Sequence, residues 1–370
     1  MKRLNLLLGL VTITLIVNIM GCSQLPPTPD LPAEPETPES WLTEIPLPAG
    51  YGAHASWIDI YFTDPGSPLA SQETGGIDGP LVASIDAARL TVDLAVYSLN
   101  LRSIRDALIR AHERGVQVRV VMESDNMDGS APQALIEAGI PLLGDRREGL
   151  MHDKFVVIDR SELWMGSMNF TYSGAYEDNN QLLLFRSVKM AENYTKEFEE
   201  MFLDDKFGDN VIPETPNPKI SIEDTRMEIY FSPDDGVAVP VLEILNNAEE
   251  SIYFMAFSFT TDEFGEAIRA QAENGLTVAG VMEEQQVKSN LGTEYDPFKQ
   301  AGLDVFIDGI AGQMHHKTMI IDERIVITGS YNFSRSAETR NDENLIVIYN
   351  EEIADLFLQE FQRVYQQSQQ

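Results

Sequence analysis

The chain has 370 residues, which is enough for two domains that each bury a hydrophobic core. Its hydrophobic content of 43% and charged content of 23% are ordinary for a globular protein, but its formal net charge is −33. Such an acidic surface repels phosphate backbones at long range, which argues against a protein that grips long DNA or RNA. It leaves room for a phosphate-bearing substrate in a local basic pocket.

Residues 1–21 have the features of an export signal. Two basic residues precede an apolar run from Leu4 to Met20, and Cys22, the only cysteine of the chain, follows Gly21. This context resembles the bacterial lipoprotein box, which implies cleavage before Cys22 and acylation of that residue. The protein would then be exported and lipid-anchored to a membrane of the bacterial cell envelope, with its catalytic part outside the cytoplasm. An ordinary signal or an uncleaved anchor stays open, because the run is nearly long enough to span a bilayer.

Residues 22–54 are predicted to form a Pro-rich tether. Six prolines lie between Pro26 and Pro38, among Glu, Thr and Ser residues. Such a composition buries no core and favours extended conformations. We expect this segment to hold the folded part away from a membrane surface.

Past the tether the sequence repeats itself weakly, with the same order of predicted elements in each copy. Short helical patterns at residues 81–90 and 239–248 precede apolar runs at 92–99 and 252–259, which are typical of buried strands. Each run leads into an amphipathic helical pattern and then into another strand, at 116–122 or 276–282. A strand–helix–strand order predicts parallel pairing with helices packed on the sheet.

The helical patterns also carry end signals. Thr260 with Glu263 has the form of a capping box, and Gly115 and Gly275 stand where a left-handed residue commonly ends a helix. We predict an α/β protein of two similar sandwich halves, each a mostly parallel or mixed sheet flanked by helices. The halves are residues 55–208 and 225–370, and the Pro-containing segment 209–224 is predicted to link them.

One motif occurs twice at a constant offset. The first copy consists of His152, Lys154, an apolar run to Asp159, then Ser167 and Asn169. The second copy consists of His315, Lys317, an apolar run to Asp322, then Ser330 and Asn332, each 163 residues after its counterpart. A single His-x-Lys arises often by chance, but two full copies inside a repeat indicate one composite site built from two halves.

Strand geometry explains the spacing inside the motif. Alternate side chains of an extended chain share a face, so each motif histidine points the same way as its lysine. The serine and asparagine also stand two apart, on what we expect to be the neighbouring strand. Two such faces meeting around a pseudo-two-fold axis would surround a phosphate with hydrogen-bond donors.

The pattern His-x-Lys-x4-Asp followed by Gly-Ser-x-Asn resembles the HKD signature of the phospholipase D superfamily, and two copies resemble its single-chain members. The resemblance runs from about Ile58 to the C-terminus. It implies phosphodiester chemistry with no metal and no other cofactor: one histidine attacks phosphorus to form a phosphohistidine, and the other protonates the leaving alcohol. It further implies a set of phosphate ligands that stabilise the transition state, namely Lys154, Ser167, Asn169, Lys317, Ser330 and Asn332.

Four residues have supporting roles in this interpretation. Asp159 and Asp322 are expected to be structural, because they lie at the far ends of the apolar runs. Glu343 and Asn180 each stand 28 residues after the motif histidine of their own half, and the resemblance implies that such a residue fixes the tautomer of the ring.

A carboxylate partner favours an imidazolium and so suits a general acid. We therefore predict His152 as nucleophile and His315 as acid, with the opposite assignment left open. His316 should face away from His315 and serve packing.

Three functions remain open from the sequence. The first is a phospholipase D-type enzyme that hydrolyses or exchanges a phospholipid headgroup, with the membrane reached through acylated Cys22 and with no obligatory protein partner. The second is an exported nuclease that cleaves DNA or RNA. The third is a non-catalytic surface binding protein, which the complete motifs disfavour. Charge and tether favour the lipid substrate.

Overall fold

The computed structural model describes residues 40–208 and 213–369. The predicted signal, Cys22 and residues 22–39 of the predicted tether lie outside these ranges. From Ser40 onward the chain forms one compact unit. None of the helices in the described ranges is both long and apolar enough to cross a membrane.

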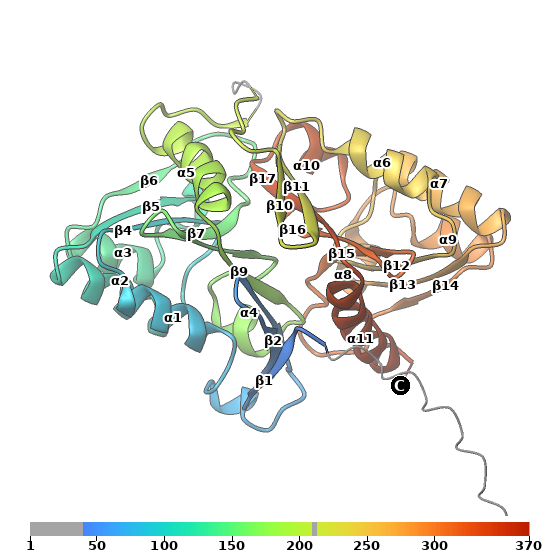
Figure 1. The fold of residues 1–370 in the computed structure, drawn as a ribbon, viewed down its shortest axis with the longest axis horizontal. Helices are drawn as coiled ribbons and strands as arrows, with labels where there is room; N and C mark the ends of the chain where they lie inside the picture. Colours follow the sequence, from blue (N-terminus) through green and yellow to red (C-terminus); the bar gives the residue numbers. More distant parts are fainter. Residues whose placement is uncertain (1–39, 209–212, 370) are drawn as a thin grey trace, which may run out of the picture. The chain divides into compact units, whose positions relative to one another are not determined.

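Each predicted half contributes one mixed sheet (Figure 1). The first sheet has nine strands, in the order β1 (Thr43–Leu47), β2 (Gly50–His54), β3 (Ile58–Thr63), β9 (Gln181–Arg186), β8 (Glu162–Gly166), β7 (Lys154–Ile158), β4 (Thr91–Val96), β5 (Gln117–Met122) and β6 (Leu142–Gly144). The second has eight, in the order β10 (Lys219–Ile222), β11 (Thr225–Ser232), β17 (Glu343–Tyr349), β16 (Ile325–Gly329), β15 (Lys317–Ile321), β12 (Ser251–Ala256), β13 (Thr277–Met282) and β14 (Asp304–Ile307). Only the last three strands of each order pair in parallel.

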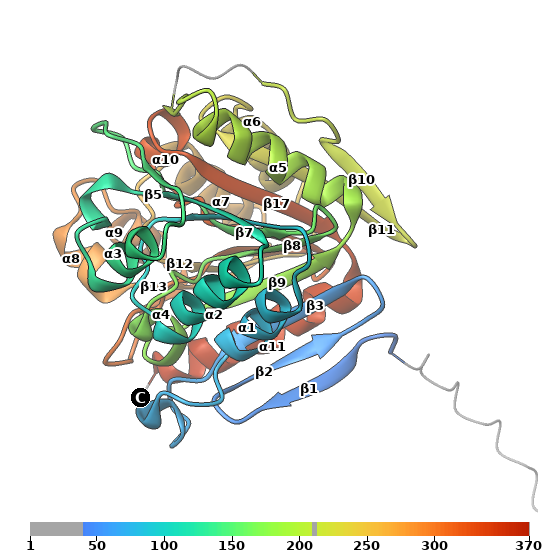
Figure 2. The same cartoon turned by 90° about the vertical axis from the view of Figure 1, so that its left-hand side faces the viewer.

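Helices cover the outer faces of both sheets (Figures 1 and 2). The first sheet carries α1 (Asp78–Ala87), α2 (Arg102–Glu113) and α3 (Ser130–Glu137), and the second carries α6 (Ala238–Asn246), α7 (Asp262–Glu273) and α9 (Tyr295–Gln300). The long helices α5 (Val188–Phe202) and α11 (Glu351–Gln367) instead contribute to the core shared by the two sheets. Shorter helices lie in the connections: η1 (Ala70–Gln72), η2 (Ser124–Asn126), α4 (Tyr172–Tyr176), α8 (Glu284–Ser289) and α10 (Arg335–Thr339).

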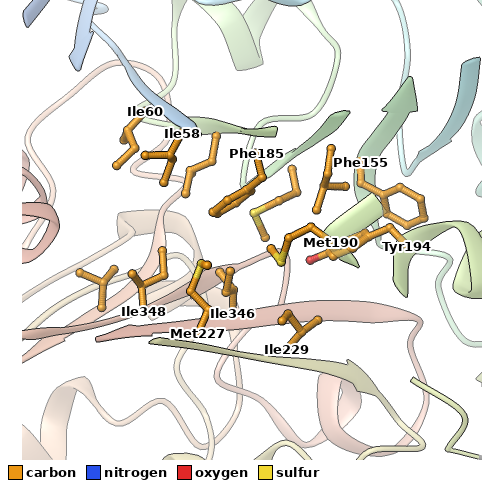
Figure 3. Close-up of a cluster of buried hydrophobic side chains, with 14 of the residues drawn as sticks. Ile58, Ile60, Phe155, Phe185, Met190, Tyr194, Met227, Ile229, Ile346 and Ile348 are labelled. Atoms are coloured by element: carbon orange, nitrogen blue, oxygen red, sulfur yellow. The ribbon is translucent and has the colours of Figure 1, made fainter. Parts of the chain in front are cut away.

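A single apolar cluster joins the two halves (Figure 3). Its fully buried members come from both sheets and from α5, among them Ile58, Phe185, Tyr194, Ile229 and Ile346. Burying a side chain of this size contributes about 1.5–3 kcal/mol. Because the cluster draws on both halves, separating them would expose it to water, and the geometry between the sheets is held as firmly as a domain core.

The predicted α/β class and the strand–helix–strand order are confirmed. β4–α2–β5 and β12–α7–β13 form in register with the expected segments, and both central pairs are parallel. Gly115 and Gly275 end their helices with φ of +88° and +99°, as expected. The capping box is wrong: α7 begins at Asp262, its N-cap residue Thr261 makes no side-chain cap bond, and the Thr260 N–H donates to the Phe333 carbonyl.

Two predicted boundaries are also wrong. Residues 43–54, assigned to the tether, form the β1–β2 hairpin that extends the first sheet, and Trp41 beside them stacks on Trp57 at 5.8 Å. Residues 219–222, assigned to the linker, form β10 and pair with β11. β1 and β10 are the edge strands of their sheets, and each pairs with one neighbouring strand only. Their short, partly polar sequences, with Pro46 in β1, did not reveal this pairing.

Candidate active site

The two motif histidines lie where short segments of one half pair with segments of the other half. His152 and His315 directly precede β7 and β15, which run through the middle of their sheets. Met151 forms a parallel bridge with Asp342 of the other half, and Asn179 forms the matching bridge with Met314. The His152 N–H donates to the Asp342 carbonyl at 3.0 Å, and the His315 N–H donates to that of Asn179 at 3.0 Å. Each histidine is thus attached to the opposite half.

The hydrogen-bond partners of the rings are crossed in the same way. His152 Nδ1 lies 2.7 Å from Glu343 Oε2, and His315 Nδ1 lies 2.9 Å from Asn180 Oδ1. The expectation that each histidine is served by the residue 28 positions later in its own half is therefore wrong. The reason is that Asn180, directly before β9, and Glu343, the first residue of β17, follow the two bridges and so lie beside the motif of the opposite half. The rule that a carboxylate partner suits the general acid would, on the observed pairing, make His152 the acid, so it no longer supports His152 as the nucleophile.

These contacts fix the tautomer of both rings. The Asn180 amide donates from Nδ2 to the Gly174 carbonyl at 2.9 Å, which leaves its Oδ1 as an acceptor. His315 must therefore donate from Nδ1, and His152 donates from Nδ1 to a carboxylate. In the neutral state both rings then carry their lone pair on Nε2. One ring nitrogen of each histidine is left to attack phosphorus or to exchange a proton.

The two lysines lie buried beside the histidines. Lys154 Nζ donates to the His152 carbonyl at 2.5 Å, and Lys317 Nζ donates to that of His315 at 2.8 Å. Their ammonium groups also stand over aromatic rings, Lys154 at 5.5 Å from Tyr97 and Lys317 at 4.5 Å from Phe257. The His-x-Lys spacing thus places each ammonium group on the backbone carbonyl of its own motif histidine.

Burial and mutual repulsion shape the protonation of this cluster. Burial lowers the pKa of Lys154 to about 8, and burial with the charge of Lys154 holds the pKa of Lys317 well below its usual value. Burial and the same two ammonium groups lower the pKa of both histidines well below the usual range. Nearby carboxylates, Glu343 among them, offset the two buried cations only in part, and a phosphate anion would relieve the remaining cost. The site is therefore electrostatically prepared for a phosphate.

The motif asparagines and serines take different places. Asn169 and Asn332 line the same cavity as the histidines, and their buried Oδ1 atoms have no hydrogen-bond partner within the described ranges. An unpartnered buried amide facing a cavity indicates a polar ligand there.

Ser167 and Ser330, predicted as phosphate ligands, lie fully buried behind the cavity instead. The Ser167 hydroxyl reaches Asn180 Oδ1 at 2.8 Å, and the Ser330 hydroxyl accepts the Asn344 N–H at 3.0 Å. Ser167 thereby positions the amide that holds His315, and Ser330 holds the backbone at the start of β17, directly after Glu343.

Asp159 and Asp322 are structural, as expected. Asp322 accepts backbone N–H bonds from Glu249, Glu250 and Ser251, the last two at 2.7 and 3.1 Å. Asp159 accepts the equivalent bonds at residues 89–91. Each carboxylate ties the end of its motif strand to the start of β12 or β4.

A second set of polar residues lies behind the histidines and was not predicted from the sequence. His316 faces away from the site, as predicted, but it is bonded to Gln181 and to Glu360, the latter at 2.8 Å. Its counterpart Asp153 accepts from Asn344 Nδ2 at 2.6 Å. Gln181 and Asn344 are themselves 163 residues apart, so the motif offset carried the signal that could have found them.

The histidines share one open cavity of about 550 Å³. Its lining combines residues of both halves: Tyr97, Leu150, His152, Asn169, Phe257, Ser258, Thr260, Gln286, Asn290, Leu291, Gln313, His315, Asn332, Ser334 and Ser336. Two imidazoles and two amides line one opening, and the two buried ammonium groups lie behind them. Together these groups form a site for phosphoryl transfer.

Comparison with known proteins agrees with this class of site. A family model described as "Cardiolipin synthase, PLD-like domain" matches residues 81–202 and 241–365, one segment in each half. The chain therefore belongs to the phospholipase D superfamily, and its activity class is that of a phosphodiesterase.

Individual relatives match one half or the whole fold. A phospholipase D of Rickettsia bellii is 32% identical over 154 residues, which make up 40% of this chain and 76% of that protein. The human mitochondrial cardiolipin hydrolase is 33% identical over 127 residues, 34% of this chain and 50% of that protein. A phosphatidylserine synthase of Haemophilus influenzae is 13% identical with a TM-score of 0.63, over 86% of this chain and 88% of its own, and so shares the fold.

Proposed function

We propose that this protein cleaves the headgroup ester of a phospholipid, by hydrolysis or by transfer to a second alcohol, through a phosphohistidine intermediate. The observation that carries the proposal is the crossed pairing of the two His-x-Lys faces around one cavity. Because each ring is held by the opposite half, both Nε2 atoms serve a single phosphorus. Such a reaction is that of a phospholipase D.

The chemistry follows from the tautomers and the charges. A bound phosphate anion offsets the two ammonium groups that lower the pKa of His315, so this ring takes up a proton at Nε2 when substrate binds. His152 Nε2 attacks phosphorus, the bond from phosphorus to the leaving oxygen breaks, and His315 gives that oxygen the proton from its Nε2. Water or another alcohol then loses a proton to His315 and attacks phosphorus, and His152 leaves. Lys154, Lys317 and the motif asparagines bind the non-bridging oxygens as negative charge develops.

The crossed pairing supplies a new reason to propose His152 as the nucleophile. A phosphorylated imidazole that still carries its Nδ1 proton is a cation for the whole life of the intermediate. Glu343 is the carboxylate that offsets that charge, at 2.7 Å. The acid must release its proton instead, and the amide of Asn180 orients His315 without holding the proton back.

Two features of the cavity favour a lipid over a nucleic acid. Its lining in the described ranges contains no arginine and no lysine, whereas a nucleic acid needs cations for the phosphates on either side of the scissile one. Leu291 stands at the rim of the cavity with 97% of its surface exposed, where it can meet a lipid surface. The predicted acylation of Cys22 would hold the enzyme at such a surface, which makes the outside of a bacterial membrane its proposed place of action.

The test is a paired assay of the full chain in EDTA, with mixed phospholipid vesicles in one arm and supercoiled plasmid in the other. Headgroup release without nicking supports the proposal, and nicking without headgroup release replaces it with a nuclease. His152→Ala and Lys317→Ala should each abolish the activity. His112→Ala, on α2 outside the motifs, is the matched control and should retain it.

A further inference from the structure

The catalytic cavity is not shared equally by the two halves. Four of its lining residues come from the first half, and eleven come from the second. The strands before it repeat with an offset of 160, so Ser258 corresponds to Ser98 and Gln286 to Asn126. Neither Ser98 nor Asn126 lines the cavity. The Asn126 amide is turned inward and donates to the Tyr97 carbonyl at 2.7 Å. The cavity wall around His315 therefore contains polar side chains, Ser258 and Gln286, whose counterparts are absent from the wall around His152.

The polar wall around His315 coincides with a short insertion in the second half. The offset between the halves is 160 at β5 and β13 but 163 at the histidines, so three residues are added between them in the second half. The first half has the three-residue turn η2 after β5, whereas the second has the six-residue helix α8 and the loop that follows it. This longer segment brings Gln286, Asn290 and Leu291 to the cavity.

The polar side chains of this wall are hydrogen-bonded to one another. Asn290 Nδ2 lies 3.0 Å from Ser258 Oγ and 3.0 Å from Gln286 Oε1, so both of these oxygens act as acceptors. The three side chains are then left with complementary groups for a ligand: the Ser258 hydroxyl proton and the Gln286 amide protons as donors, and the Asn290 carbonyl as acceptor. A hydroxyl group, which both donates and accepts, fits this set.

The lack of charged side chains in the wall further restricts the class of ligand that it can bind. Apart from the two histidines, no titratable acid or base lines the cavity on the second-half side of the described structure. A cationic headgroup would face the ammonium groups of Lys154 and Lys317 with no carboxylate beside it. An anionic one would find no arginine. An uncharged headgroup with several hydroxyls meets neither repulsion nor a missing counter-charge, because neutral amides and hydroxyls of the wall replace its hydrogen bonds to water.

We propose that Ser258, Gln286 and Asn290 form a subsite for an uncharged, hydroxyl-bearing alcohol esterified to the scissile phosphate, such as glycerol or a sugar alcohol. The subsite lies beside His315, the proposed acid, so it holds the alcohol whose oxygen receives the proton. This inference rests on the proposed phospholipid function and deepens it by naming the class of headgroup.

The test compares two headgroups of matched size on the same short acyl chains. Dihexanoyl phospholipids with a glycerol or a 1-propanol headgroup are supplied below their micelle concentrations, so that the membrane surface plays no part. The full chain should cleave the glycerol ester with a kcat/KM about tenfold higher than that of the propanol ester. Asn290→Ala should bring the ratio close to one, mainly by slowing the glycerol ester.

Controls separate the subsite from a structural effect and from the proposed function. Gln285→Ala changes the exposed neighbour on the same helix and should leave the ratio at its original value. Equal kcat/KM for the two esters in the unaltered chain, or an Asn290→Ala variant that loses both activities equally, would overturn the subsite while leaving the function standing. Cleavage of neither ester together with plasmid nicking would refute the function itself.

Discussion

Glu343→Gln is the substitution that probes the crossed pairing most closely. Glutamine keeps the shape of the side chain and a hydrogen-bond acceptor for His152 Nδ1, but removes the negative charge that lies 2.7 Å from the ring. A hydrogen bond to a charged group is worth about 1.5–3 kcal/mol and a neutral one about 0.5–1.5 kcal/mol. The loss of roughly 1–1.5 kcal/mol of transition-state stabilisation corresponds to about a tenfold fall in kcat/KM.

The pH profile carries the more specific part of this prediction. Burial raises the pKa of Glu343 to about 7, so the carboxylate is charged above that pH. Burial lowers the pKa of Lys154 to about 8, against the effect of Glu343, so the ammonium is charged below that pH. We expect a bell-shaped kcat/KM with limbs near these values. In Glu343→Gln the acid limb should disappear and the alkaline limb should move to lower pH.

The assay is release of a headgroup from short-chain phospholipid between pH 5.5 and 9.5, with thermal unfolding measured alongside. Because the pKa of Glu343 is raised by folding, its charged form costs stability, and this cost grows as the pH rises through the window from its ordinary value to 7. Glu343→Gln should therefore unfold no earlier than the unaltered chain at pH 7.5. Glu266→Gln, on the exposed face of α7, is the control. A Glu343→Gln profile with both limbs unmoved would refute the reasoning.

The remaining predictions concern the frame and the rim of the site. Asp322→Ala removes the acceptor of three backbone N–H groups and should lower the free energy of unfolding by about 2 kcal/mol in urea titrations, whereas a cost below about 0.5 kcal/mol would contradict its structural role. The same N–H groups, against the effect of burial, lower the pKa of Asp322, so its contribution should be lost as the pH falls below the ordinary range of aspartate. Leu291→Asp should reduce cleavage of vesicle phospholipid several-fold while cleavage of monomeric short-chain phospholipid stays unchanged, and equal loss on both substrates would exclude a role for Leu291 at the lipid surface.

The sequence was sufficient for the repeat, the strand–helix–strand order and the two His-x-Lys faces. These depend on local periodicity and on a constant offset, both of which survive in a single chain. Asp159 and Asp322 were assigned correctly for the same reason, since a residue at the end of a buried strand has few roles other than tying it down.

The partners of the histidines could not be predicted, because they depend on how the halves meet. Glu343 and Asn180 stand at matching positions in the sequence, and nothing local shows that each crosses to the other half. The same holds for Ser167 and Ser330, whose hydroxyls are spaced like ligands but lie behind the rings. The edge strands β1 and β10 were missed because their pairing is long-range and their composition is that of a linker.

The central claim is that His152 and His315, one from each half, act on the same phosphorus in different roles. The most direct measurement is quenching of the full chain and its two histidine variants in neutral denaturant during turnover of a phospholipid, followed by mass spectrometry of the histidine-containing peptides at neutral pH, because acid hydrolyses the phosphorus–nitrogen bond. We predict a phosphatidyl adduct on His152 in the unaltered chain and its absence in His152→Asn. With a phosphatidyl ester of p-nitrophenol, whose leaving group needs no proton, the adduct should accumulate in His315→Asn, which lacks the base for the second step. An adduct on His315, or turnover that persists in either variant, would contradict the account.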